Sequence, residues 1–174
     1  MAQEYGNEIF FGSDHGRIWR YQKQGGQFEL LQLPASSRIV EIKKINEQAI
    51  LIVTKTDGFF VYDVASKGME HYEASRLPKA PVRSAYMDKY SEIWFEQEVP
   101  GTVAHFNAKT KVLKTEVIPV EPTSTDRSRP AFHVHEDIYG TVWVHPYGGG
   151  FSRFDRENNR LQSFYNLSLI HISE

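Results

Sequence analysis

Short apolar runs bounded by polar and turn-forming residues recur along this chain of 174 residues. Four runs hold three consecutive apolar residues: IFF at 9–11, ILI at 50–52, IWF at 93–95 and VWV at 142–144. Runs so short, and so rich in β-branched and aromatic residues, are typical of strands that are buried on both faces. No stretch shows the 3.6-residue stripe of an amphipathic helix. The pattern therefore predicts an all-β protein with almost no helix.

Each run is followed by an aromatic anchor that stands directly before a polar residue. The anchors lie 41, 44 and 48 residues apart, at Tyr21, Tyr62, Phe106 and Phe154. An apolar residue stands three positions before every anchor and another stands seven positions after it: Ile18, Phe59, Val103 and Phe151, then Phe28, Met69, Leu113 and Leu161. A β-sandwich does not require the same columns to recur four times, so the columns favour a structural repeat.

The repeat predicts four strands in each copy, which in the second copy are residues 38–42, 50–54, 59–63 and 69–73. A four-stranded antiparallel unit of this period is typical of a β-propeller blade. We expect a partial β-propeller over 1–166, as a fragment of a larger ring. The blades are predicted at roughly 5–33, 38–78, 82–119 and 130–166, the first being incomplete because it lacks its first strand. Residues 167–174 depart from the repeat and are predicted to be a non-native tail.

Composition and charge narrow the function classes. The 20 basic and 22 acidic residues leave a net charge of −2 without a basic block, so no nucleic-acid partner is expected. The chain has no cysteine, which excludes disulfides, thiolate zinc sites and a cysteine nucleophile. No apolar run approaches the roughly 18 residues that a membrane-spanning helix needs.

The fourth copy carries the most distinctive pattern. An acid and a glycine in a turn are followed by a tryptophan between valines, a glycine-rich turn, an aromatic–Asp pair and a final aromatic residue. The residues at these positions are Asp137, Gly140, Trp143, Gly149, Gly150, Phe154, Asp155 and Phe164. The pattern resembles the two-component regulator propeller repeat, and the first three copies match it more loosely.

The resemblance implies a β-propeller from the periplasmic sensor region of a hybrid two-component histidine kinase of gut Bacteroidetes. Such regions bind glycan fragments and signal across the membrane. On this hypothesis the segment senses a glycan-derived ligand, has no catalytic residues and needs no cofactor, while a kinase lies elsewhere in the full-length protein. The expected partners are an oligosaccharide, the remaining blades and sensor domains, and a second copy in a full-length homodimer.

Four side chains are candidate ligand contacts. Tyr139 and Tyr147 fall in turns, where an aromatic ring can offer a flat apolar platform to a sugar. His133 and His135 alternate on one face of a first strand and could contact a ligand or share a metal ion. No third metal ligand is identifiable, so we predict no metal site, and the alternative interpretation is a polar face on the channel wall. The polar connection at 120–130 is a further candidate for a binding loop.

Two other function classes stay open. The segment SEIWFEQEVPGTVAHFN at 91–107 is similar to repeats of streptogramin-lyase-type propellers, which are metal-dependent enzymes. A site of that kind would use His105, His133 and His145, which fall on different predicted strands. The other class is a passive propeller scaffold for protein contacts. The glycines at 148–150 are predicted to form a turn, because a strand and not a helix follows them.

Overall fold

The computed structural model describes residues 1–98, 101–118, 132–146 and 150–164. Across these ranges a single 3-10 turn, η1 (Ala74–Arg76), interrupts an otherwise all-β structure, and no helix has the length and apolar character needed to cross a membrane. The strands are β1 (Ala2–Tyr5), β2 (Glu8–Gly12), β3 (Arg17–Gln22), β4 (Gln27–Gln32), β5 (Ile39–Lys44), β6 (Ala49–Thr54), β7 (Phe59–Asp63), β8 (Met69–Tyr72), β9 (Val82–Met87), β10 (Glu92–Gln97), β11 (Thr102–Asn107), β12 (Val112–Val117), β13 (Phe132–Glu136), β14 (Val142–Pro146), β15 (Phe151–Asp155) and β16 (Arg160–Phe164).

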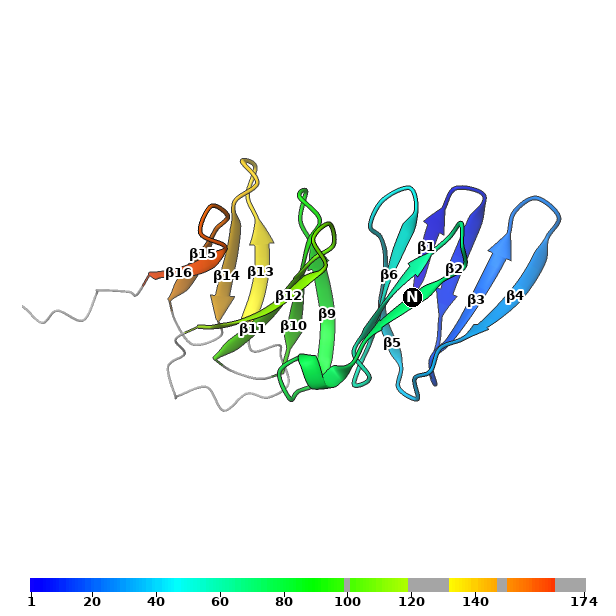
Figure 1. Cartoon of the computed structure of the whole chain (residues 1–174), viewed down its shortest axis with the longest axis horizontal. Helices are drawn as coiled ribbons and strands as arrows, with labels where there is room; N and C mark the ends of the chain where they lie inside the picture. Colours follow the sequence, from blue (N-terminus) through cyan, green and yellow to red (C-terminus); the bar gives the residue numbers. More distant parts are fainter. Residues whose placement is uncertain (99–100, 119–131, 147–149, 165–174) are drawn as a thin grey trace, which may run out of the picture.

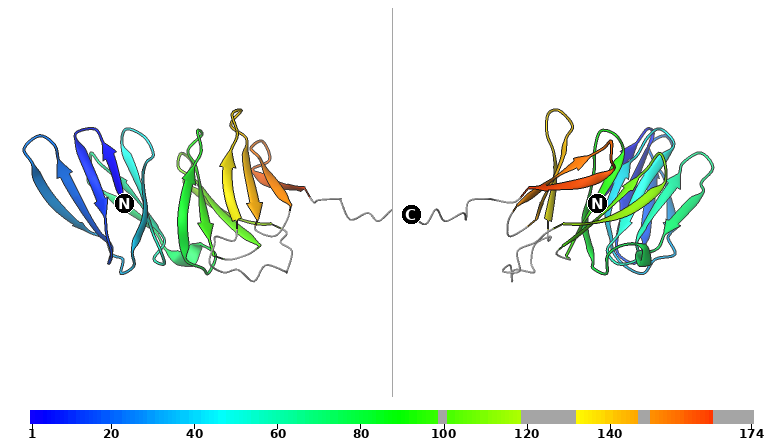
Figure 2. Two further views of the ribbon diagram at one scale, coloured as in Figure 1. Left: turned by 180° about the vertical axis from the view of Figure 1, so that it is seen from behind. Right: turned by 60° about the vertical axis from the view of Figure 1, so that its left-hand side comes forward.

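The strands form four antiparallel sheets, each with four strands hydrogen-bonded in chain order. We name them blade 1 (β1–β4), blade 2 (β5–β8), blade 3 (β9–β12) and blade 4 (β13–β16). They stand side by side in chain order (Figure 1), and the two further views keep that order (Figure 2). Neighbouring blades touch through their inner strands: β1 and β2 contact β5, β5 and β6 contact β9, and β10 contacts β13. The predicted all-β propeller architecture is confirmed.

Blade 1 has the first strand that the sequence pattern did not reveal. Residues Ala2–Tyr5 form β1 and pair antiparallel with β2, Ala2 opposite Phe11 and Tyr5 opposite Glu8. The prediction of an incomplete first blade beginning at residue 5 is therefore wrong. The segment AQEY escaped notice because it has no apolar run, and its side chains are exposed or half-buried. Backbone pairing alone defines this strand.

The second strand of each blade explains the three-residue apolar runs. In β6, Ile50 and Ile52 belong to the core between blades 1 and 2, whereas Leu51 and Val53 belong to the core between blades 2 and 3. All four side chains are fully buried. Successive side chains on a strand point to opposite faces. A strand covered on both faces is therefore apolar at every position, and each buried branched side chain contributes roughly 1.5–3 kcal/mol.

Three core clusters correspond to the three junctions between blades. The cluster between blades 2 and 3 is rich in rings, with Phe59 stacked on Tyr72 at 4.6 Å and packed against Phe95 and Phe106 at 4.7 and 5.0 Å. The anchor residues Tyr62, Phe106 and Phe154 each lie in the cluster shared with the preceding blade. The repeating columns of the sequence are thus the contact positions between blades.

In blades 2, 3 and 4 the polar residue after the anchor caps the hairpin between the third and fourth strands. Asp63 Oδ1 accepts the backbone N–H of Ser66 at 2.7 Å, and Asn107 Oδ1 accepts the N–H of Thr110 at 2.9 Å. Asp155 Oδ1 accepts the N–H of Asn158 at 3.2 Å in the same way. Each hairpin then turns through a residue in the left-handed region: Gly26 (φ 64°), Lys67 (57°), Lys111 (57°) and Asn159 (49°). The hairpins of blades 2, 3 and 4 therefore share one capped turn, and blade 1 keeps the left-handed residue at the same position but has a second one, Gly25 (φ 101°).

Two glycines with positive φ provide a matched test of turn packing: Gly26 in the β3–β4 hairpin and Gly58 in the β6–β7 turn. A Cβ at Gly26 (φ 64°) meets nothing within 4 Å, whereas a Cβ at Gly58 (φ 85°) would lie 2.0 Å from the carbonyl oxygen of Tyr72. We expect Gly26→Ala to lower the free energy of unfolding by about 1 kcal/mol through backbone strain alone. Gly58→Ala should cost about 3 kcal/mol or more, because backbone must also move. Urea unfolding of both variants measures the difference, and equal losses would contradict the close packing at Gly58.

Candidate functional site

His133 and His135 lie together on the open face of blade 4. They alternate along β13 and pair across to β14, His133 opposite His145 and His135 opposite Trp143. Their neighbours Phe132 and Val134 face blade 3 instead. Both histidines are exposed on the face of blade 4 opposite to Phe132, and His133 Nδ1 also lies 3.8 Å from Glu96 Oε1 of blade 3. The structure places both histidines on one face of β13, while their role as ligand contacts stays a prediction.

Tyr139 stands at the tip of the turn between β13 and β14 and is 80% exposed. Asp137 holds this turn: Oδ1 accepts the backbone N–H groups of Tyr139 and Thr141, both at 2.9 Å, and Oδ2 accepts the indole N–H of Trp143 at 2.9 Å. These donors, the indole first, lower the pKa of the Asp137 carboxyl. The ring of Tyr139 is thus presented to solvent by a rigid turn.

Several predicted features lie outside the described residues: Tyr147, the connection at 120–130, the tail at 167–174, and the first two glycines of 148–150. The third glycine, Gly150, is described and has φ 70°. This positive φ agrees with the predicted glycine turn before β15.

The turn between β9 and β10 repeats the Asp137 turn in blade 3. Asp88 Oδ1 accepts the backbone N–H groups of Tyr90 at 2.8 Å and Glu92 at 3.0 Å. The other oxygen of Asp88 accepts Arg156 Nη2 from blade 4 at 2.5 Å, and the Arg156 guanidinium lies 4.1 Å from the ring centroid of Tyr90. Tyr90 remains 45% exposed. The structure thus offers a second presented tyrosine, beside Arg156.

The two tyrosine turns are adjacent. Lys89 Nζ donates to the carbonyl oxygen of Tyr139 at 2.8 Å, and the Lys89 backbone N–H donates to Glu136 Oε2 at 3.2 Å. Tyr86 Oη donates to the same Glu136 oxygen at 3.0 Å. Burial and this hydrogen bond raise the pKa of Tyr86 to about 12. Polar contacts therefore tie the two turns together across the junction of blades 3 and 4.

A pocket of about 480 Å³ opens beside Tyr90 at this junction. In it, His105 Nδ1 lies 2.5 Å from Glu92 Oε1, and Asn107 Nδ2 donates to Glu92 Oε2 at 2.7 Å. His105 is buried and stacks on Trp94 at a centroid distance of 4.6 Å. The lining residues are Tyr90, Glu92, His105, Asn107, Lys109, Thr110, Val112, Lys114, Phe154, Arg156 and Asn159. We call the exposed rings of Tyr90 and Tyr139 together with this pocket the tyrosine surface.

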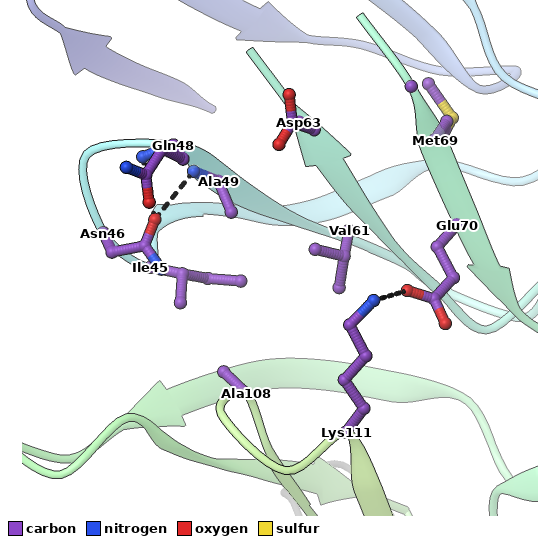
Figure 3. A pocket seen from close by; sticks show the side chains of 11 residues that line it. Ile45, Asn46, Gln48, Ala49, Val61, Asp63, Met69, Glu70, Ala108 and Lys111 are labelled. Atoms are coloured by element: carbon purple, nitrogen blue, oxygen red, sulfur yellow. Dashed lines mark hydrogen bonds and ion pairs between the residues drawn. The ribbon is translucent and has the colours of Figure 1, made fainter. Parts of the chain in front are cut away.

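A second pocket, of about 430 Å³, occupies the equivalent place between blades 2 and 3 (Figure 3). Lys111 extends from the β11–β12 turn and pairs with Glu70 of β8 at 2.6 Å, closing one side. Ile45, Val61 and Ala108 supply apolar walls. No tyrosine lines this pocket. Aromatic platforms beside polar groups therefore distinguish the junction of blades 3 and 4.

Sequence reasoning found Tyr139 but missed Tyr90, Glu92 and Arg156. A signal for Tyr90 was present: DKYSEIW at 88–94 and DIYGTVW at 137–143 share an acid, a tyrosine two residues later and a tryptophan at the same spacing. Arg156 carried no signal, because its position next to Tyr90 depends on how blade 4 packs on blade 3.

The three histidines of the enzyme alternative do not meet. His105 is buried on the side of blade 3 that packs on blade 4, while His133 and His145 lie on the opposite side of blade 4. Among the described residues, no group of three or more histidine, aspartate or glutamate side chains is arranged to hold a metal ion.

No protein-family model matches the chain, and no curated protein matches it in sequence. Solved structures do match. Virginiamycin B lyase from Staphylococcus aureus superposes with a TM-score of 0.65 at 16% identity, over 95% of this chain and 55% of the lyase. The extracellular domain of a hybrid two component system from B. thetaiotaomicron superposes with a TM-score of 0.61 at 17% identity, over 91% of this chain and 22% of that one. At these identities the similarity shows the propeller fold alone. The chain spans about half the length of the lyase and about a fifth of the length of the sensor domain.

The buried Glu92–His105 pair should matter for stability. Removing the carboxylate with Glu92→Ala leaves His105 and Asn107 without their shared partner in the core, so we expect a loss of about 3 kcal/mol in the free energy of unfolding. Glu47→Ala, which removes an exposed ion pair with Lys44, should cost less than about 1 kcal/mol. Urea unfolding compares the two, and a loss for Glu92→Ala no larger than the control's would contradict the role of this pair.

Alkaline pH should destabilise the chain through two tyrosines. Burial, followed by the bond to Glu70, raises the pKa of Tyr72 to about 12, and Tyr86 behaves alike beside Glu136. An unfolded tyrosine loses its proton near pH 10, while the folded one keeps it to about 12. The free energy of unfolding therefore falls as pH rises from about 10 to about 12. The double variant Tyr72→Phe with Tyr86→Phe should flatten that fall, and an unchanged pH slope would show that other groups cause it.

Proposed function

We propose that this chain is a ligand-sensing segment of an extracytoplasmic, hybrid two-component sensor protein, and that it binds a glycan-derived ligand without catalysing a reaction. The similarity to the extracellular domain of a hybrid two component system supports the sensor class. The fourth-blade motif supports it independently, since Asp137, Gly140 and Trp143 form one hydrogen-bonded turn. The remaining blades, the kinase and a full-length homodimer belong to the same proposal, with no nucleic acid and no cofactor.

The tyrosine surface is the observation that carries the ligand class. Sugars bind proteins through apolar ring faces stacked on aromatic side chains, with polar groups around them that fix the hydroxyls. Tyr139 offers an exposed ring, and Tyr90 offers another beside the Arg156 guanidinium. Asn107 and Lys114 line the adjoining pocket and can hydrogen-bond to hydroxyl groups. Because hydrogen-bonded turns fix the backbone of both tyrosines, little backbone conformational entropy is lost on binding.

The location at a blade junction supports a sensing role. Asp88–Arg156, Tyr86–Glu136 and Lys89–Tyr139 are all contacts between blades 3 and 4. A ligand that touches both blades would favour the arrangement in which these contacts are complete. Its differential affinity for two arrangements is the free energy available for a signal.

The lyase alternative is the weaker candidate for this segment. His105 of blade 3 packs against one face of blade 4, whereas His133 and His145 lie on the opposite face, so the three histidines do not form one site. Similarity to a lyase in fold alone does not transfer its chemistry. Nor do His133 and His135, on the open face of blade 4, belong to the tyrosine surface. They belong to the proposal as contacts of a ligand bound at that face, and Tyr147, which lies outside the described residues, is a further candidate.

Binding of neutral oligosaccharides to the full chain tests this proposal. In two-dimensional NMR titrations with a panel of plant and host glycan fragments, a binding fragment should shift signals of the β9–β10 and β13–β14 turns. Tyr139→Ala and Tyr90→Ala should each weaken binding about fivefold or more, since a stacked ring contributes of the order of 1 kcal/mol or above. Phe28→Ala, an exposed ring on blade 1, is the matched control and should leave the affinity unchanged.

Two results would overturn the assignment. One is a glycan that binds with equal affinity to the wild type and to both tyrosine variants, which would place its site elsewhere. The other is the absence of binding by every fragment in the panel while a protein partner binds through the two turns, as the scaffold alternative predicts.

A further inference from the structure

One position in the fourth strand of every blade lies eight residues after the aromatic anchor and carries a polar side chain. We call it the fourth-strand position, and its occupants are Glu29, Glu70, Lys114 and Gln162. In blades 1, 2 and 4 the side chain offers an acceptor oxygen, whereas in blade 3 it is an ammonium. Because the blades repeat one another, the first three show what this position normally binds.

A base is bound at the fourth-strand position in each of blades 1, 2 and 4. The three hydrogen-bonded pairs are Glu29 with Arg20 at 2.8 Å, Glu70 with Lys111 at 2.6 Å and Gln162 with Arg153 at 3.0 Å. The glutamate–lysine pair joins two neighbouring blades and is drawn in Figure 3. An acceptor oxygen and a base therefore meet at this place wherever the acceptor belongs to the chain.

Lys114 reverses the charge at the fourth-strand position and lacks the carboxylate partner. Its ammonium donates to the backbone carbonyl oxygen of Asn159 at 3.1 Å, and no acidic side chain of the described residues pairs with it. Glu116 lies two residues further along β12, where its Oε1 is 3.8 Å from His105 Nε2. Lys114 is half-buried. Since an ammonium has three N–H donors, Lys114 keeps donors for a further acceptor.

The pocket at the junction of blades 3 and 4 supplies no carboxylate to replace that partner. Glu92 is the one acid among its lining residues, and its two oxygens are occupied by His105 and Asn107. Lys109 lines the same pocket and has no partner among the described residues. The space of about 480 Å³ is therefore bordered by two lysines, Lys109 and Lys114, with which no described carboxylate pairs.

The corresponding pocket between blades 2 and 3 has the opposite balance of charge. Its charged lining residues are Asp63, Glu70 and Lys111, two acids and one base. The pocket between blades 3 and 4 has three bases and one acid. Two exchanges at equivalent positions account for most of this difference, Asn107 in place of Asp63 and Lys114 in place of Glu70. The positive lining thus belongs to the junction that also carries the exposed tyrosines.

We propose that this pocket takes an anionic group, the carboxylate or the sulfate ester of an acidic sugar, and that Lys114 binds it. The anion fills the place that a carboxylate of the chain fills in blades 1 and 2. This inference rests on the proposed function, because the sugar that carries the anion is the one that contacts Tyr90 beside the pocket. Hydrogen bonds between an ammonium and an oxygen anion are roughly twice as strong as neutral ones. The pocket therefore selects acidic glycans over neutral ones.

A neutral hydroxyl group fits the place beside Lys114 less well. A hydroxyl can accept one hydrogen bond from the ammonium, but it leaves the charge without a counterion when the ligand displaces water from the pocket. A carboxylate or a sulfate accepts the same hydrogen bond and also offsets the charge. Binding energy from this contact is therefore available to an acidic sugar and largely withheld from a neutral one.

Matched acidic and neutral ligands test the inference on the full chain. An oligogalacturonide and its methyl ester differ in the carboxylate charge, and a sulfated galactan fragment and its desulfated form differ in the sulfate. Isothermal titration calorimetry at one ionic strength should show an acidic form binding about tenfold more tightly than its neutral counterpart, the factor expected of one charge-assisted hydrogen bond. The pair that shows this preference identifies the source of the anion.

Three lysine variants locate the contact. Lys114→Gln keeps a polar side chain and removes the charge, so it should bind the acidic and the neutral form with equal affinity. Lys114→Arg keeps the charge and should retain the preference. Lys111→Gln is the matched control, because it removes an exposed lysine of the same blade that lies outside this pocket, and it should also retain the preference. Circular dichroism confirms that all three variants are folded.

The outcomes separate this inference from the proposed function. If the neutral forms bind as tightly as the acidic ones, the inference is wrong and the proposed function stands. An acidic preference that survives in Lys114→Gln places the anion elsewhere, and a preference lost equally in Lys111→Gln reflects overall charge, so each contradicts the assignment to Lys114. Absence of binding by all four ligands counts against the proposed function and this inference together.

Discussion

The two central sheets of this structure, blades 2 and 3, are covered on both faces, and the packing that covers them organises the rest of the described chain. A four-stranded sheet with apolar residues at alternate and intervening positions has no side that water can solvate well. Blades 2 and 3 bury both sides inside the chain, because Ile50 and Leu51, or Ile93 and Trp94, face different neighbours and are both fully buried. Stacking of blades is the arrangement that buries two faces of many small sheets at once.

The same stacking creates the candidate site. Turns from neighbouring blades meet at each junction, and the side chains on those turns decide whether the junction is an apolar seam or a polar pocket. Between blades 2 and 3 the turns bring Ile45 near Ala108, and the contact is apolar. Between blades 3 and 4 they bring Asp88 to Arg156, which lies over Tyr90 and borders the pocket of Glu92 and His105. One repeated scaffold thus carries different chemistry at equivalent positions.

The same packing distinguishes the inner faces from the two outer ones. Trp19 and Trp143 occupy positions that are fully buried at the junctions between described blades, whereas Trp19 is 42% exposed and Trp143 is half-buried on faces that no described blade covers.

The sequence by itself determined the blade: strand positions, turn positions and contact columns follow from the spacing of apolar runs, aromatic anchors and polar turn residues. This information is local, because side-chain alternation and turn chemistry act within a few residues. It failed for β1, whose polar AQEY segment is defined only by pairing with β2. The candidate site was predicted in part, since Tyr139 was visible in its turn, while Arg156 gained its partners Asp88 and Tyr90 only when blade 4 packed on blade 3. Tertiary structure alone decided those contacts, because residues 68 positions apart, such as Asp88 and Arg156, meet only through the stacking of whole sheets.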